Sequence, residues 1–241
     1  MSSARFGLLI VTLLGVLVWD QPASSQQTSS AQSANDSQAV AVVQAAITAL
    51  GGATAIAQPQ GWTFQASLQG PIANGTVSYS LGWDTGIVRT VVSPNGKVGK
   101  ARPIQSLFVP VVIGSVLLGE SKDPQFVIKY GGVIDIDSVS VAVVNFSVTA
   151  MPSIISQVWW FDATTGLPKR VAFNMPAEIG SRVSLPGLIE LSDYRSVSGV
   201  LHPFRIITQL SGRPPEIVTL QSAVTSSVAP ISDFDSMSGD L

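Results

Sequence analysis

Residues 192–206, SDYRSVSGVLHPFRI, combine charged side chains that are scarce elsewhere with the single histidine of the chain, His202. An acid, a histidine and a serine are the groups of a hydrolytic triad, which assembles in space rather than in sequence. Pro203, however, favours an extended backbone at His202, and the turn before it brings Asp193 and His202 close together on paired strands. We therefore predict a hairpin with Asp193, Arg195 and His202 on its solvent face. A hydrolase that uses His202 is kept as an alternative.

The residue types of the chain give little support to other kinds of catalysis. The chain has no cysteine and one histidine, which excludes thiol chemistry, thiolate metal sites and a two-histidine zinc site. It has neither a G-x-S-x-G nucleophile elbow nor a glycine-rich phosphate loop. Asp135 and Asp137 fit a solvated turn region better than an acid–base pair. The sequence therefore predicts a protein that is not an enzyme, with no catalytic residue, no metal site and no cofactor.

The composition excludes some partners and indicates export. The 241 residues are 46% hydrophobic and 12% charged, with a net charge of −2, so no basic surface is available to attract nucleic acid. Arg5 precedes the apolar stretch 6–19, and small residues follow, which is typical of a signal peptide over 1–25 cleaved near Ser25. The apolar stretch is shorter than the ~20 residues of a spanning helix. We expect a periplasmic or secreted protein that is not integral to the membrane once the signal is removed; a retained N-terminal anchor is the alternative.

Residues 26–36 are rich in Ser, Gln and Ala and predict a flexible leader. A capped helix follows and stops at Gly51-Gly52. Apolar residues then alternate with polar ones, which predicts antiparallel strands. The apolar run 103–119 interrupts them, and Pro110 can begin a helix over 111–118. The expected strands cover 62–69, 75–81, 87–93, 126–130, 140–149, 157–161, 169–174, 187–194, 201–209 and 216–223.

These elements predict an α+β fold dominated by one long antiparallel sheet of nine to eleven strands, with two or three helices. A single domain over 37–235 and a frayed tail over 236–241 are expected. A sheet of this length has one face that must be covered, and two helices cover it only partly. An interior suited to acyl chains and a plainly filled core both remain open at this point.

Several stretches resemble a known family. WWFDATTGLPKRV and LSDYRSVSGVLHPFRI are similar to consecutive hairpins of the periplasmic outer-membrane lipoprotein carrier and receptor superfamily, and PEIVTLQSAV and ISDFD follow in the same order. The resemblance covers roughly 37–235. It implies an incomplete half-barrel, with helices over the concave face of the curved sheet and an apolar cavity for acyl chains. The chain departs from the family in two ways: no arginine can be assigned to the cavity, and no lipobox cysteine is present.

The leading hypothesis is an exported protein, expected to be a monomer, that binds a lipid, a lipoprotein acyl chain or another apolar ligand. The residues 108–118 would form a lid. An envelope structural or interaction module with a filled core is the alternative, and a small integral β-barrel is disfavoured by the all-apolar central run and the non-aromatic C-terminus. The candidate cavity residues are Trp62, Phe64, Tyr79, Leu81, Phe108, Val112, Leu117, Phe146 and Phe173.

Overall fold

The computed structural model describes residues 35–58, 61–71, 74–82, 86–92, 94, 102–103, 110–149, 156–176 and 184–226. The chain divides into two compact units, Met1–Gln32 and Ser33–Leu241, and every described residue lies in the second. The predicted signal peptide, residues 26–34 of the leader, the tail over 236–241 and Phe108 all lie outside the described residues. The predicted domain boundaries therefore remain a prediction.

The described residues form one antiparallel sheet of eleven strands, in the order β4-β3-β2-β1-β11-β10-β9-β8-β7-β6-β5. The last strand, β11, lies between β1 and β10, and every other neighbour in the sheet is also a neighbour in sequence. The strands are β1 (Gly61–Gln69), β2 (Gly75–Gly82), β3 (Gly86–Val92), β4 (Arg102–Pro103), β5 (Phe126–Ile136), β6 (Val139–Val148), β7 (Ser156–Asp162), β8 (Pro168–Pro176), β9 (Ser184–Val197), β10 (Val200–Leu210) and β11 (Glu216–Ser226). The predicted α+β fold with an open half-barrel sheet is confirmed.

The two faces of the sheet follow from the alternation of side chains along each strand. In β1 the residues Trp62, Phe64, Ala66 and Leu68 are buried, and the residues between them are at least partly exposed. The first three pair in register with buried residues of β2, as Phe64 does with Tyr79. The core therefore lies on one face of the sheet, which we call the inner face.

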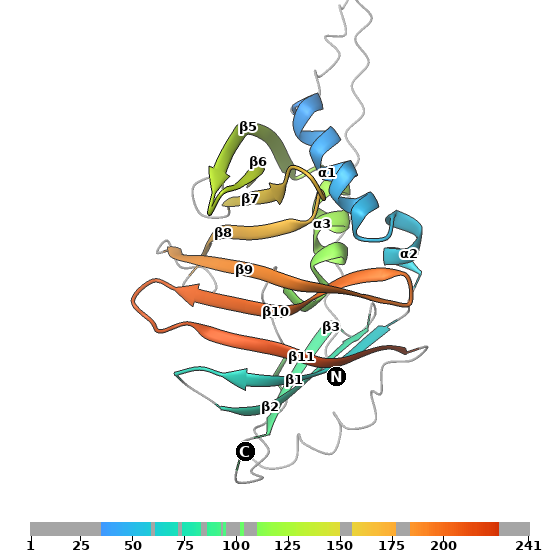
Figure 1. The fold of residues 1–241 in the computed structure, drawn as a ribbon, viewed down its shortest axis with the longest axis vertical. Coiled ribbons are helices and arrows are strands. Elements are labelled where there is room, and N and C mark those ends of the chain that lie inside the picture. Colours follow the sequence, from blue (N-terminus) through green and yellow to red (C-terminus); the bar gives the residue numbers. More distant parts are fainter. Residues whose placement is uncertain are drawn as a thin grey trace, which may run out of the picture. The chain divides into compact units, whose positions relative to one another are not determined.

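Helices cover the inner face. They are α1 (Ser37–Ala49), α2 (Ala53–Ala57), the 3₁₀ turn η1 (Pro110–Val112) and α3 (Ile113–Lys122). The helix α3 packs against β10 and β5 of the sheet and against α1 and α2 (Figure 1). The predicted helix over 111–118 falls within η1 and α3 but ends four residues before Lys122, and the sequence did not predict α2. None of the helices in the described part of the chain is long and apolar enough to cross a membrane.

The end of α1 is held against the β9–β10 hairpin by a close backbone approach. The N–H of Leu201 donates to the carbonyl oxygen of Leu50 over 2.9 Å. Gly51 has a φ of 122°, and a Cβ atom at this position would collide with the carbonyl oxygen of Gly199. The Gly-Gly stop of the helix is thus required for packing, because no side chain fits between the two backbones.

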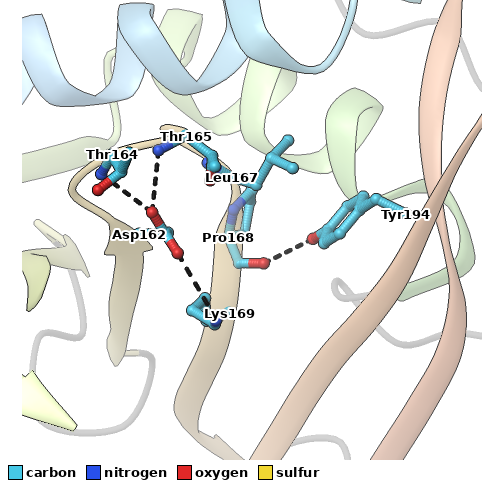
Figure 2. Close-up of polar contacts among 7 residues, drawn as sticks. All are labelled: Asp162, Thr164, Thr165, Leu167, Pro168, Lys169 and Tyr194. Atoms are coloured by element: carbon cyan, nitrogen blue, oxygen red, sulfur yellow. Dashed lines mark hydrogen bonds and ion pairs between the residues drawn. The ribbon is translucent and has the colours of Figure 1, made fainter. Parts of the chain in front are cut away.

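The β7–β8 turn is fixed by its own side chains, as Figure 2 shows. The carboxylate of Asp162 accepts from the N–H groups of Thr164 and Thr165, both at 2.9 Å, and these bonds hold its pKa below the usual range. The O–H of Tyr194 on β9 donates to the carbonyl oxygen of Pro168 over 2.7 Å (Figure 2). This bond joins the two stretches that carry the family resemblance.

Candidate ligand-binding face

Most of the predicted cavity residues lie together in the core on the inner face. Seven of them are buried, with exposed fractions between 0% for Phe64 and 6% for Leu81, and all seven belong to one apolar cluster. Phe173 is half-buried and packs against the same cluster. The sheet supplies Trp62, Phe64, Tyr79, Leu81, Phe146 and Phe173, and the helical side supplies Val112 and Leu117.

Aromatic rings form two groups on this face. At one end the rings of Trp62 and Phe64 on β1 stack with centroids 5.8 Å apart. Further across the sheet, Phe146 on β6 lies 5.7 Å from Trp159 on β7, which stacks on Phe161 at 5.8 Å. Aromatic side chains bury ~150–250 Å² each, so this surface would favour apolar chains over polar solutes if the helices moved aside.

The segment over this surface is Pro110–Lys122, which contains η1 and α3 and is called the central helical segment below. Its buried residues include Val111, Val112, Ile113 and Leu117. Their periodic spacing continues to Glu120, whose side chain also faces inward and is only 7% exposed. The segment is therefore apolar on its inner side except at this one carboxyl group.

His202 is not on the solvent face, and this prediction was wrong. Its side chain is 3% exposed, and its ring lies 4.4 Å from Trp62 and 5.3 Å from Phe64, edge-on to both. The reason is the alternation along β10, in which His202 shares a face with Val200 and Phe204. A neutral imidazole packs among these rings because its ring atoms are largely apolar.

One polar contact holds His202 in place. Its Nδ1 lies 3.1 Å from the carbonyl oxygen of Val111 on η1. Because a carbonyl oxygen can only accept, Nδ1 carries the proton and Nε2 is left as an acceptor in the neutral ring. Burial lowers the pKa of His202, and the bond to Val111 opposes that effect. The Nε2 atom has no hydrogen-bond partner within the described part of the structure.

Asp193 and Arg195 lie at the surface as predicted. Their side chains are 44% and 58% exposed and form an ion pair of 2.7 Å with each other. The guanidinium of Arg195 also lies 4.6 Å from the ring centroid of Phe204. In the observed register His202 pairs with Arg195, and Tyr194 pairs with Pro203. The pairing therefore assembles no Asp–His couple, and it gives the hydrolase alternative no geometric support.

A second buried polar group, Glu120, begins a chain of hydrogen bonds. Its Oε1 accepts from Nε2 of Gln157 on β7 over 2.6 Å, and Oε1 of Gln157 accepts from the indole N–H of Trp159 over 2.6 Å. Burial raises the pKa of Glu120 to about 7, and the charge of Asp123 adds to this effect while the bond to Gln157 opposes it. Its Oε2 has no partner among the residues that the structure describes.

Sequence reasoning missed this chain, although two patterns pointed to it. Glu120 follows Ile113 and Leu117 at helical spacing, which places it on the buried stripe of α3. Gln157 precedes Trp159 and Phe161 at strand spacing, which places it on the inner face. The helix was ended too early to include Glu120, so neither pattern was used.

The opposite face of the sheet carries a pocket of about 180 Å³. Trp160, Arg170, Glu190 and Ile207 pair in register across β7, β8, β9 and β10, and all four line this pocket. Arg170 forms ion pairs with Glu190 at 3.0 Å and with Asp137 at 2.8 Å, so its charge is balanced. Within the described ranges, no three His, Asp or Glu residues are grouped to hold a metal ion.

Comparisons with known proteins found similar solved structures. No family model matches the chain, and no curated protein matches it. A LolA superfamily protein from Nitrosomonas europaea is 14% identical, with a TM-score of 0.50 and coverage of 79% of this chain and 94% of that one. An outer membrane lipoprotein-sorting domain from Vibrio parahaemolyticus is 10% identical, with a TM-score of 0.46 and coverage of 83% and 97%. A DUF1329 family protein from Desulfovibrio piger is 12% identical, with a TM-score of 0.44 and coverage of 78% and 93%.

The Nitrosomonas europaea structure establishes the class of fold. At 14% identity the likeness concerns the fold alone, and it extends over nearly the whole of the other chain. The chain has a LolA-like fold. The predicted resemblance to the lipoprotein carrier superfamily is confirmed at this level.

Proposed function

We propose that this chain is an exported, non-enzymatic protein that binds a lipid, a lipoprotein acyl chain or another apolar ligand on the inner face of its half-barrel. The proposal is supported by the way in which that face of the sheet is covered. Aromatic and aliphatic side chains of the sheet are closed off by short helices rather than by a second sheet.

We infer that this cover can move while the strand pairing of the sheet stays intact. In the part of the chain that the structure describes, the central helical segment meets the sheet through side-chain packing and through polar contacts at His202 and at Glu120. The sheet itself is held by its own strand-to-strand pairing. Displacing the segment would expose part of the apolar inner face, and an acyl chain would replace the contacts that the sheet side chains lose.

Mass spectrometry of organic extracts tests the proposal. The purified protein is expected to carry lipid in a fixed molar ratio, or to bind an added apolar fluorescent probe that acyl chains displace. Replacing Phe146 with Asp should abolish binding, whereas replacing Trp160 with Asp on the opposite face should not. A wild-type protein that neither carries lipid nor binds the probe would refute the proposal.

One observation favours the alternative of an envelope structural or interaction module. The candidate residues of the inner face are already packed in this conformation, with Phe64 and Leu117 fully buried. A core that never opens would leave the chain to act through a protein partner. Hydrogen exchange distinguishes the two, because a lid must expose the amides of α3 much more often than those of β9 and β10.

A further inference from the structure

The hydrogen-bond chain at Glu120 has directions that its chemistry fixes. An indole N–H can only donate, so the atom of Gln157 next to Trp159 is the amide oxygen and the atom next to Glu120 is the amide nitrogen. That nitrogen donates, so Oε1 of Glu120 is an acceptor. The proton of a neutral Glu120 therefore resides on Oε2.

The proton on Oε2 of Glu120 has no hydrogen-bond acceptor among the described residues. Glu120 is 93% buried by its 7% exposure, and Oε2 has no hydrogen-bond partner within the described ranges. Burial raises the pKa of Glu120 to about 7, which keeps the carboxyl neutral in mildly acidic solution. A buried donor without an acceptor is rare in folded proteins, because nothing replaces the water that it gave up.

The position of Glu120 indicates what could supply the acceptor. It lies one helical turn after Leu117, a candidate cavity residue on the helical side. Through Gln157 and Trp159 it reaches Phe146, a candidate cavity residue on the sheet, whose ring centroid is 5.7 Å from that of Trp159. The carboxyl group of Glu120 is thus a polar group in an apolar interior, between the central helical segment and the sheet.

We infer that Glu120 is the polar anchor of the inner face, and that its Oε2–H donates to the carbonyl oxygen of an acyl ester or amide whose chain lies on the aromatic surface. This inference rests on the proposed function and narrows its ligand class. A carbonyl group offers the acceptor that a hydrocarbon lacks. A free carboxylate would instead meet a second acid in a dry interior, which disfavours it.

Other titratable groups that could give ester binding a pH dependence lie on α3 and on the elements packed around it, and on α3 that group is Lys122. The helices α1 and α2 and the turn η1, which pack around α3, contain no charged residue. Asp123, after α3, raises the pKa of Glu120. The neighbouring strands contribute the titratable residues Lys129, Tyr130, Asp135, Asp162, His202 and Arg205.

The test compares methyl palmitate with hexadecane as competitors of a fluorescent naphthylamine probe bound to the full chain. At pH 5.5 the wild type should bind the ester about tenfold more tightly than the alkane, the value of one good hydrogen bond to an otherwise unpaired group. At pH 8.5, where Glu120 is ionised, that preference should disappear. Alkane binding should change little between the two conditions.

Two substitutions make the test specific. Glu120→Leu should bind both competitors equally at either pH. Glu120→Gln keeps a donor that cannot ionise, so it should retain the ester preference at pH 8.5, and it preserves the bond to Gln157 if Glu120→Leu fails to fold. Glu190→Leu and Glu190→Gln, on the opposite face, are matched controls and should behave as the wild type.

The outcomes separate the inference from the function on which it rests. Equal binding of ester and alkane by the wild type at pH 5.5 overturns the anchor and leaves apolar binding intact. An ester preference that persists in Glu120→Leu, or in the wild type at pH 8.5, also overturns it. If neither competitor displaces the probe, the proposed function fails and the anchor fails with it.

Discussion

Each end of the central helical segment makes a buried polar contact with the sheet, but the titratable group lies on the sheet at one end and on the segment at the other. At the η1 end the sheet supplies the titratable group, His202, and the segment supplies only the carbonyl oxygen of Val111. At the α3 end the segment supplies the titratable group, Glu120, and the sheet supplies the neutral amide of Gln157. Burial lowers the pKa of His202 and raises that of Glu120 to about 7, so it favours the neutral form at both ends.

The difference between an acid and a base gives the two ends opposite responses to pH. The Glu120 end is most stable at low pH, where its carboxyl is protonated in both the folded and the unfolded state. The His202 end is most stable at high pH, where the imidazole is neutral in both states. Two similar contacts on one segment therefore do not loosen together, and each can be broken alone.

The largest expected effect comes from the aromatic support of the Glu120 end. Trp159→Ala removes a fully buried ring and the donor that orients Gln157, and should lower the free energy of unfolding by about 3–5 kcal/mol. Urea denaturation at pH 6 measures this loss. The adjacent Trp160 faces the opposite side of the sheet and is half-buried, so Trp160→Ala should cost about 1 kcal/mol. Equal losses would show that the two faces do not differ in packing.

The next effect is the pH dependence of the Glu120 end. The unfolded carboxyl has a pKa of 4.5 and the folded one a pKa of about 7. The folded state therefore holds the proton that the unfolded state has released, and stability should fall by about 3 kcal/mol as the pH rises from 4.5 to above 7. Urea denaturation across this range should show the slope in the wild type and not in Glu120→Gln. An unchanged slope in the variant would assign it to other groups.

The His202 end should show the opposite sign and a smaller effect. Because the folded pKa lies below the unfolded value of 6.5, stability is lost as the pH falls through and below 6.5. Glu120→Gln is the useful background, since Glu120 no longer contributes there. Adding His202→Leu should remove this acid sensitivity and cost about 1–2 kcal/mol at neutral pH, because the carbonyl of Val111 loses its donor. Acid sensitivity that survives the second substitution would contradict the assignment.

The smallest expected effect comes from Tyr194. Its hydroxyl group already has a hydrogen-bond partner, so it serves as a reference for Glu120 and His202. Tyr194→Phe removes the 2.7 Å bond to the carbonyl oxygen of Pro168 and should cost about 1 kcal/mol, with little change between pH 5 and 8. Thermal unfolding followed by circular dichroism is sufficient to detect it. Tyr130→Phe is the matched control on β5 and should change stability by less than about 0.5 kcal/mol. A loss for Tyr194→Phe no larger than that for Tyr130→Phe would contradict a stabilising role of the bond between Tyr194 and Pro168.

The elements of the fold were largely predictable from local patterns. The strands of the hairpins at 157–174 and 187–209 were placed close to their observed bounds, because alternation of period two is a property of each strand by itself. The stop at Gly51 was also predictable. Its reason was not, since the carbonyl oxygen that excludes a side chain there belongs to Gly199.

The site was predicted less well, and two residues show why. His202 was placed on the surface, although it shares a face of β10 with the buried Phe204, two residues further along the strand. A histidine is usually assigned to solvent by its polarity, and only its surroundings of Trp62, Phe64 and Val111 make the neutral ring acceptable. Glu120 was missed because the predicted helix ended at residue 118, before the buried stripe of α3 reaches this residue.

The sequence by itself determined the α+β class, the antiparallel sheet, the helix caps and turns, and the apolar residues of the inner face. These depend on periodicity and turn chemistry, which act over a few neighbouring residues. The tertiary structure alone decided which polar groups share that interior. His202 with Val111 and Glu120 with Gln157 are joined across 91 and 37 positions of the chain. Burial changes the chemistry of these groups, and burial is set by distant segments rather than by local sequence.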